Sequence, residues 1–355
     1  MPEIDSFRSE VRQWLADNCP ASQRTPATRD EQFWGGRRGH YPSEDAKLWF
    51  ERMRDRGWTA PTWPTEYGGG GLSETEAKIL KEEMRALGAR TPLYGLGLWM
   101  LGPALLEHGT EAQKKEYLTG IVRGETRWCQ GYSEPGAGSD LASLQCRAED
   151  RGDHFLVNGT KIWTSRADTC DWIFCLVRTD PEAPKQAGIS FLLIDMDSPG
   201  ISVSPIKLLS GESEFCQTFL DNVQVPKDNL VGELHQGWTV AKSLLKHERK
   251  LMSEIGTDIP SINPRDLLAD YAPMQDGKIA DPALRLKQVE FDMQMHALGL
   301  THLRGFEERQ AGHTGDSALI MKYVGTEIET QRGELLLALL GSAGLGWEGE
   351  AFSQQ

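Results

Sequence analysis

The hydrophobic pattern of this chain changes its period twice, and this change limits the folds that the chain can adopt. Apolar residues recur at helical spacing up to about residue 125, as Leu80, Met84 and Leu87 do. Short apolar runs between clusters of Pro, Gly and Asp replace this spacing up to about residue 236, and helical spacing then returns. The pattern predicts an α+β, mainly α protein with an N-terminal helical domain over 1–125, a small β-barrel or β-sandwich over 126–236 and a C-terminal helical bundle over 237–355.

The middle part contains candidate strands separated by turn residues. Asn158 and Gly159 lie between the strand-like segments 155–157 and 160–163. Because Asn-Gly readily adopts the positive φ angles of a two-residue turn, this segment predicts a β-hairpin. Four further runs are typical of strands, at 172–177, 189–194, 201–206 and 215–225. No alternation of strands with helices accompanies them, which disfavours a doubly wound parallel sheet.

Two long amphipathic helices are predicted near the C-terminus, over 281–311 and 316–341. A shorter helix over 240–256 precedes them, and the proline-containing segment 259–278 is predicted to be an irregular connection. One stripe of the first long helix joins five residues at helical spacing: Leu284, Gln288, Phe291, Met295 and Leu298. These stripes are too broad for one small bundle to bury, so the chain is expected to form a homo-oligomer, a dimer or a tetramer.

Charge and composition exclude several classes of function. The 355 residues carry 52 acidic and 38 basic side chains, a formal net charge of −14. A surface for nucleic acid or anionic membranes needs clustered Lys and Arg, so neither partner is expected. The N-terminus does not resemble a signal peptide and no run approaches about 18 apolar residues, which predicts a cytoplasmic protein without membrane insertion. The six cysteines include no Cys-x-x-Cys pair and are interpreted as free, mostly buried thiols that hold no metal.

Two short segments combine residues suited to binding a ligand. The first, 128–140, has the sequence Trp-Cys-Gln-Gly-Tyr-Ser-Glu-Pro-Gly-Ala-Gly-Ser-Asp, in which small residues let the backbone approach a ligand and hydroxyl groups can donate to it. The second, 161–165, has the sequence Lys-Ile-Trp-Thr-Ser and places a flat aromatic ring beside hydroxyls. From composition alone, a turn-rich linker is the simpler interpretation of the first segment, and a core position is that of Trp163.

In order and spacing, segments 132–140 and 158–165 resemble the two flavin-contact motifs of the acyl-CoA dehydrogenase family. Segments 64–69, 109–117 and 225–232 also resemble the family, so the similarity spans nearly the whole chain. The resemblance implies bound FAD and α,β-dehydrogenation of an acyl-CoA thioester in fatty acid and lipid metabolism, with an electron-transfer flavoprotein as electron acceptor. It also implies assembly through the C-terminal helices, commonly as a homotetramer. On this basis 128–140 is interpreted as a binding segment and not as a linker.

The resemblance also implies roles for individual residues. Trp163 corresponds to the wall of one face of the isoalloxazine ring, and Ser133 and Ser165 correspond to hydrogen-bonding positions near it. Backbone amides and hydroxyls of 130–133 would face the pyrimidine edge of the ring and polarise it to accept hydride. Ser139 corresponds to a contact shared with the thioester substrate. The expected cofactor-binding residues are therefore Gln130, Tyr132, Ser133, Gly138, Ser139, Trp163 and Ser165.

The reaction also needs a base, because the α-proton of a thioester is too weakly acidic for a carboxylate in water. The site must stabilise the developing enolate by hydrogen bonds to the carbonyl oxygen, and desolvation must strengthen the carboxylate as a base. Most family members carry this glutamate in a Glu-Gly-Thr-like segment near the C-terminus, which the sequence up to Gln355 does not contain.

A smaller branch of the family, the isovaleryl- and long-chain-type enzymes, carries the base on an earlier helix directly before an arginine. Glu248-Arg249 occupies a matching place, which makes Glu248 the candidate base. Two alternatives remain open at this point. The pair could form a solvated or ion-paired helix face, or the acting glutamate could lie in residues beyond Gln355.

Two departures from the family pattern leave other functions open. Many relatives contact the FAD of a neighbouring subunit through an Arg-x-x-Phe-Gly motif, but segment 263–287 contains only Arg265 and Arg285, with no Phe-Gly after them. Together with the absent Glu-Gly-Thr segment, this leaves a non-catalytic structural subunit of a heteromeric acyl-CoA dehydrogenase as an alternative. An acyl-CoA oxidase is a further alternative, which differs in whether oxygen reaches the reduced flavin.

Overall fold

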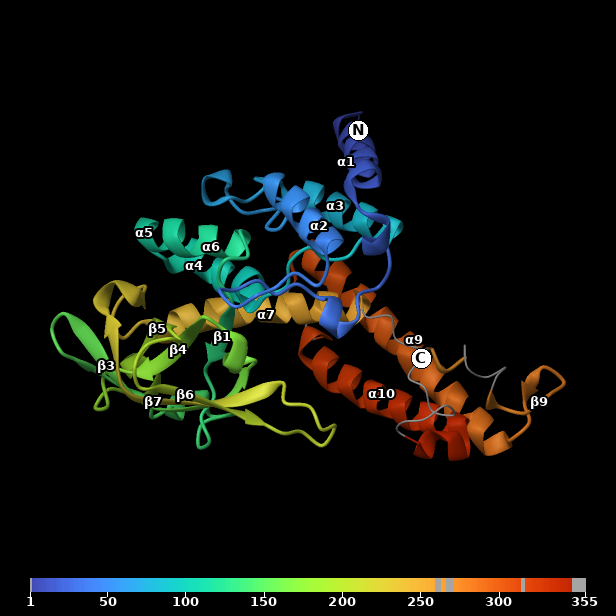
Figure 1. The fold of residues 1–355 in the computed structure, drawn as a ribbon. Coiled ribbons are helices and arrows are strands. Elements are labelled where there is room, and N and C mark those ends of the chain that lie inside the picture. The colour runs from blue at the N-terminus through green and yellow to red at the C-terminus, as the bar shows by residue number, and fades with distance from the viewer. Residues whose placement is uncertain (1, 259–262, 266–270, 314–316, 347–355) are drawn as a thin grey trace. The chain divides into compact units, whose positions relative to one another are not determined.

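The computed structural model describes residues 2–258, 263–265, 271–313 and 317–346, and the chain divides into two compact units. The first unit is Met1–Thr257 and the second is Asp258–Gln355. Helices α1–α6, an eight-stranded sheet and the long helix α7 make up the first unit (Figure 1). Helices α9 and α10 and a short hairpin belong to the second. The domain boundaries at 125 and 236 remain predictions.

The first part of the chain is helical, as its sequence period predicts. Capping residues start several of its helices: at α3 the Ser73 hydroxyl accepts a hydrogen bond from the Glu76 amide, and the Glu76 carboxylate accepts one from the Ser73 amide at 2.8 Å. Arg12 and Arg8 join α1 to α3 and, against the effect of burial, lower the pKa of Glu83 to about 2. The helices are α1 (Pro2–Asn18), α2 (Glu44–Asp55), α3 (Glu74–Leu87), α4 (Gly102–His108), α5 (Glu111–Gln113) and α6 (Thr119–Val122), with π-helical turns at Gly97–Leu101 and Lys114–Leu118.

The middle part forms a mixed sheet, and β4 to β7 confirm the four predicted strand runs. The strand order is β6-β7-β3-β2-β4-β5-β8, and β1 pairs with β4. The β1–β4 and β2–β4 pairs are parallel, whereas the other pairs are antiparallel. The barrel or sandwich description remains a prediction. The strands are β1 (Trp128–Gly131), β2 (Arg147–Asp150), β3 (His154–Ser165), β4 (Trp172–Arg178), β5 (Ile189–Asp195), β6 (Ile201–Ile206), β7 (Phe215–Pro226) and β8 (Leu230–Val231).

The hairpin predicted at Asn158-Gly159 is wrong. These two residues lie inside β3, a continuous strand of 12 residues, where the register with β7 shifts between Val157 and Gly159. Gly159 allows a close approach of two backbones, since a Cβ atom on it would lie 2.7 Å from the Cα atom of Cys146. The Asn158 side-chain oxygen accepts a hydrogen bond from the Asn222 amide at 2.8 Å. The Asn-Gly pair therefore marks a β-bulge and a crowded strand contact, and not a chain reversal.

The sheet of the first unit carries an apolar core on each face. Alternate residues of β4 supply both cores: Phe174 and Leu176 lie in the core shared with the helices, and Ile173, Cys175 and Val177 lie in the opposite one. The second core also contains four more of the cysteines. All six cysteines are free and buried, which confirms their interpretation from the sequence.

The second unit pairs the two predicted long helices, α9 (Pro282–Gln310) and α10 (Ser317–Leu340), beside a hairpin of β9 (Met274–Gln275) and β10 (Lys278–Ile279). Leu284, Gln288, Phe291 and Leu298 of the predicted stripe pack inward, whereas Met295 is 40% exposed. Part of the connection predicted over 259–278 lies outside the described residues. No helix in the described part of the chain is long and apolar enough to cross a membrane. Other large apolar side chains of the two helices are exposed, among them Leu286, Met293, Phe306, Ile320 and Tyr323.

Candidate functional site

Strand β1 leads into the first of the two predicted binding segments. β1 pairs with β4 along all four of its residues, and the chain continues through Tyr132 and Ser133. A tight turn follows, which two hydrogen bonds of 3.0 Å between the backbones of Glu134 and Ala137 close. The segment is therefore an ordered strand and turn, and its interpretation as a linker is wrong.

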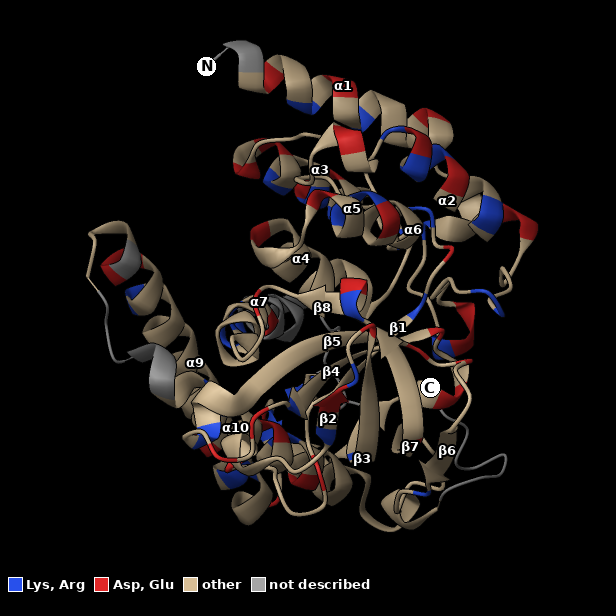
Figure 2. Ribbon diagram, turned by 90° about the vertical axis from the view of Figure 1, so that its left-hand side faces the viewer, with Lys and Arg blue, Asp and Glu red and all other residues tan. Residues whose placement is uncertain are grey.

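A buried ion pair joins this turn to β3. The Lys161 ammonium group lies 2.7 Å from the Glu134 carboxylate and 3.1 Å from the Tyr132 carbonyl oxygen, and none of the Lys161 side chain is exposed. The Glu134 carboxylate also accepts hydrogen bonds from the amides of Gln145 and Cys146, at 2.6 and 2.9 Å. Charged residues of the first unit lie mostly on its helices and loops and few lie on the sheet (Figure 2). Because a buried charge is costly unless it is paired, this pair specifies how the turn meets β3.

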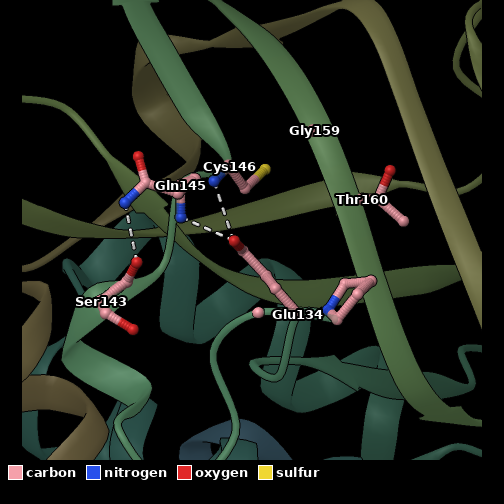
Figure 3. A pocket seen from close by; sticks show the side chains of 8 residues that line it. Glu134, Ser143, Gln145, Cys146, Gly159 and Thr160 are labelled. Carbon is pink, nitrogen blue, oxygen red and sulfur yellow. Dashed lines mark hydrogen bonds between the residues drawn. The ribbon is translucent and has the colours of Figure 1, made fainter.

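An open pocket of about 450 Å³ adjoins the ion pair (Figure 3). The Glu134 carboxylate points across it toward the backbone of Gln145 and Cys146, and the Gln145 side chain donates a hydrogen bond to the Ser143 carbonyl oxygen at 2.9 Å. These polar groups satisfy one another, so the pocket offers a ligand little free charge. Its lining residues are Glu134, Pro135, Gly136, Ser143, Gln145, Cys146, Gly159 and Thr160.

The two predicted binding segments meet at a backbone hydrogen bond. The Ile162 amide donates to the Ser133 carbonyl oxygen at 2.9 Å. Ser133 follows β1, and Ile162 lies in β3 directly before Trp163. The structure thus brings the 130–133 segment beside the residue predicted to wall the flavin, although the two are far apart in the sequence.

Trp163 has an unusual backbone and an unusual exposure. Its φ angle is +61°, in the left-handed region that residues other than glycine rarely adopt, and its side chain is 52% exposed. The register between β3 and β7 shifts at this residue, and its ring meets that of Phe215 edge-on with the centroids 5.9 Å apart. A conformation of this kind costs about 1–3 kcal/mol, and such strain gathers at ligand sites. Trp163 is therefore placed to offer its ring to a flat ligand.

Several polar side chains of the two segments are without a partner among the described residues. Gln130 and Ser133 are half-buried, Ser165 is half-buried at the end of β3 and Ser139 is exposed beyond the turn. None of these four side chains forms a hydrogen bond within the part of the chain that the structure describes. A Cβ atom on Gly138 would meet nothing within 4 Å. The site thus has half-buried hydroxyl and amide groups without partners, and it has free space beside Gly138. Both features suit a ligand with polar edges.

Helix α7 (Gly237–Asp258) carries the candidate base. It lies between α4 and β5 (Figures 1 and 2) and buries Val240, Ala241 and Leu244 in the core shared with the sheet. Glu248 lies four residues after Leu244 and continues this buried face. Glu248 is half-buried and forms no hydrogen bond or ion pair with Arg249 or with any other described residue. An ion pair of Glu248 is therefore not seen among the described residues.

The ring of Tyr132 faces into this same core. Phe174 and Phe191 contact it edge-on, with centroids 6.1 and 6.3 Å away. Burial raises the pKa of the Tyr132 phenol well above its usual value, and the nearby Glu248 carboxylate raises this pKa further. Tyr132 was predicted only as a cofactor contact, and this second environment was not predicted. Alternation along β1 was the available signal, because it puts Tyr132 on the face of the buried Trp128.

A polar cluster that the sequence analysis missed fixes the flank of α7 against α4. Ser243 donates to one carboxylate oxygen of Glu107 at 2.5 Å, and the His247 ring lies 2.9 Å from the other. The Ser243 hydroxyl lowers the pKa of Glu107, against the effect of burial, and His247 and His108 lower it further. The cluster therefore orients the helical turn that carries Glu248.

The two arginines singled out in place of the absent Arg-x-x-Phe-Gly motif are engaged within the second unit. Arg265 pairs with Asp292 at 2.6 Å. Arg285 donates a hydrogen bond to the Ile279 carbonyl oxygen at 3.0 Å. The first contact ties segment 263–265 to α9, and the second ties β10 to α9.

Comparison with protein-family models matches two consecutive parts of the chain. Residues 1–125 match the model described as acyl-CoA dehydrogenase, N-terminal domain. Residues 129–223 match the model described as acyl-CoA dehydrogenase, middle domain. The second match contains β1 except its first residue, the Glu134 turn and Trp163.

Comparison with individual proteins extends the similarity to the whole chain. Acyl-CoA dehydrogenase IpdE1 of Mycolicibacterium smegmatis is 34% identical over 364 aligned positions, which cover 100% of this chain and 90% of the relative. The solved structure called Tcur3481-Tcur3483 steroid ACAD is 32% identical with a TM-score of 0.71, covering 99% of this chain and 88% of the other. The ChsE4-ChsE5 complex from Mycobacterium tuberculosis is 28% identical with a TM-score of 0.69, covering 98% and 86%.

Proposed function

The chain belongs to the acyl-CoA dehydrogenase family, and from that premise we propose that it removes the α and β hydrogens of an acyl-CoA thioester with FAD as its cofactor. Family membership makes the chain an acyl-CoA dehydrogenase-like flavoprotein oxidoreductase. The proposal also names three further things: the residues that hold the flavin, the residue that acts as the base, and the electron acceptor.

Strands β1 and β3 hold the flavin in this proposal. When it is bound, FAD supplies the acceptor of the β-hydride. The Trp163 ring would cover one face of the flavin, and the hydroxyls of Ser133 and Ser165 would hydrogen bond near its polar edge. The unpartnered side chains and the strained, exposed ring support these roles. The remaining proposed contacts are Gln130, the main chain of Tyr132, Gly138 and Ser139, the last of which also reaches the thioester.

Glu248 takes the α-proton in this proposal. Its carboxylate is half-buried and unpaired among the described residues, so it can accept a proton without first breaking an ion pair. Hydrogen bonds to the thioester oxygen must stabilise the negative charge that develops as the proton leaves.

One observation carries the proposal: the Ser133–Ile162 hydrogen bond sets the exposed, strained Trp163 beside segment 130–133. The test is an anaerobic titration of the purified, FAD-saturated protein with a panel of acyl-CoA thioesters. We expect the absorbance of the oxidised flavin to disappear and an equal amount of enoyl-CoA to form. A protein that binds FAD but shows neither change with any acyl-CoA would contradict the proposed activity.

Trp163→Ala is expected to release FAD and to lower the melting temperature of the FAD-loaded protein, because a bound ligand adds stability by mass action. Without FAD the variant should melt no lower than the wild type, since alanine removes the exposed ring and not a buried one. The flavin-to-protein absorbance ratio and thermal melts with and without FAD check this. Trp163→Phe, which keeps a flat ring, is the matched control and should retain more FAD. Equal flavin content in all three proteins would place the flavin elsewhere.

Other subunits cover the exposed apolar faces of α9 and α10 in this proposal. The ChsE4-ChsE5 complex is a relative that contains two different chains, which favours a second candidate function as one chain of a heteromeric acyl-CoA dehydrogenase. Light scattering together with flavin content distinguishes the two. A yellow tetramer of this chain alone supports the homomer, whereas a colourless protein that gains FAD and activity only with a related chain supports the heteromer.

The acyl group and the electron acceptor complete the proposal. A relative called a steroid ACAD supports including a steroid-derived acyl-CoA in the panel beside straight-chain thioesters. An electron-transfer flavoprotein would be the electron acceptor in this proposal. Rapid formation of hydrogen peroxide in air, without that acceptor, would instead identify an acyl-CoA oxidase.

A further inference from the structure

The hydroxyl of Tyr132 is a buried donor without an acceptor. Tyr132 is 5% exposed, and its hydroxyl oxygen has no hydrogen-bond partner within the described residues. The two other buried tyrosines of the same core differ, because Tyr67 binds Glu111 at 2.8 Å and Tyr117 binds Asn229 at 3.0 Å. Leaving a buried hydroxyl unpaired costs free energy, so the lack of an acceptor for the Tyr132 hydroxyl needs an explanation.

Helix α7 brings a carboxylate without a partner to this hydroxyl. Leu244 lies in the same core as Tyr132, and Glu248 lies one helical turn further along the same face. The Glu248 carboxylate raises the pKa of the Tyr132 phenol. An unpaired donor directly after β1 and an unpaired acceptor on α7 therefore adjoin the same core.

We propose that Tyr132 is a positioning residue, whose hydroxyl donates a hydrogen bond to the Glu248 carboxylate when acyl-CoA is bound. This inference rests on the proposed role of Glu248 as the base. Glutamate has several side-chain torsions through which its carboxylate can reach a fixed donor. The hydrogen bond holds one oxygen of Glu248 in place and leaves the other free to take the α-proton.

The same hydrogen bond keeps the base charged. A bound acyl-CoA excludes water from the carboxylate, and desolvation favours the protonated form, which cannot accept a proton. A hydroxyl that donates to the carboxylate favours the charged form and counters this effect. Tyr132 therefore sets the pH above which Glu248 works.

Other charged or titratable groups near Glu248 contribute to its electrostatic surroundings. The His247 ring is engaged with Glu107, and no described residue among these groups forms a hydrogen bond with Glu248. Their effects are shared by the wild type and by a variant that changes Tyr132 alone. These groups are His247 and Arg249 on α7, Glu107 and His108 on α4, and Cys175 on β4 beside Tyr132.

Tyr132→Phe tests the inference, because it removes one oxygen and keeps the ring against Phe174 and Phe191. The pH dependence of kcat and kcat/KM is measured on the FAD-saturated protein with its acyl-CoA. We expect kcat to fall about 10–100-fold with little change in KM or flavin content. The acid limb of the pH profile should move to higher pH, because the carboxylate loses the donor that favours its charged form. The melting temperature should not fall, since the hydroxyl has no partner within the described residues.

Tyr117→Phe is the matched control, because Tyr117 is buried in the same core but binds Asn229. It should lower the melting temperature and leave the acid limb in place. If Tyr132→Phe keeps the wild-type kcat and acid limb while Glu248→Gln is inactive, the inference about Tyr132 is overturned and the proposed base stands. If Glu248→Gln is active, the proposed base is wrong, and the inference falls with it.

Discussion

Glu248→Gln is expected to lower the rate of flavin reduction by acyl-CoA about 10²–10⁴-fold, the contribution typical of a general base. Glutamine has nearly the shape of glutamate but cannot accept the α-proton, so FAD content and acyl-CoA binding should stay close to those of the wild type. Stopped-flow absorbance of the flavin under anaerobic conditions gives the rate, and a binding titration gives the affinity for acyl-CoA.

Glu233→Gln is the control for this variant, because Glu233 is an exposed glutamate a few residues before α7 and its side chain forms no hydrogen bond among the described residues. Its flavin reduction should match that of the wild type. A Glu248→Gln protein that retains most of its activity would show that another group takes the proton. Loss of activity together with loss of FAD would show instead that the substitution disturbs the fold.

Lys161→Met is expected to lower the free energy of unfolding by about 3–5 kcal/mol, because it leaves the buried Glu134 carboxylate without its cation. The Lys161 side chain is fully buried, so solvent cannot replace the lost charge. The same variant should lose FAD, since Lys161 lies in the sequence segment that carries Trp163. Chemical denaturation with and without FAD measures both effects.

Two comparisons sharpen this experiment. Lys185→Met removes the lysine of an exposed pair with Asp140, whose side chains are both more than half exposed, and should cost less than about 1 kcal/mol. Lys161→Met combined with Glu134→Gln removes both buried charges and should recover part of the lost stability. A cost for Lys161→Met no larger than that for Lys185→Met would contradict the structural role of the buried pair.

The arrangement of helices and strands follows from local sequence patterns where those patterns are unambiguous. Strands β4 to β7 lie close to the predicted ranges, because each is a short run bounded by clusters of Pro, Gly and Asp. Helices α9 and α10 also lie close to the predicted ranges. The Asn158-Gly159 pair shows the limit of such reasoning. A glycine needed for a tight turn and a glycine needed for a close backbone contact look the same in sequence, and only the position of Cys146 separates them.

The candidate site was predictable in its segments but not in its internal contacts. The resemblance of 132–140 and 158–165 to two flavin-contact motifs predicted two binding segments, and the structure joins them at Ser133 and Ile162. The Lys161–Glu134 pair and the ring of Tyr132 were not predicted, since each depends on which side chains a neighbouring element presents. The environment of Glu248 could not be predicted from the sequence either, because a Glu-Arg pair can lie on a solvated or on a buried face of a helix.

The Glu134 carboxylate has a consequence for how the protein meets its cofactor. It binds one lysine and two backbone amides at once, so the turn, β2 and β3 are already held together within the folded chain. These segments therefore lose their conformational freedom when the chain folds, and not when FAD binds. The affinity for FAD should accordingly depend less on the ordering of loops than on the area and polarity of the surface that the turn and β3 expose.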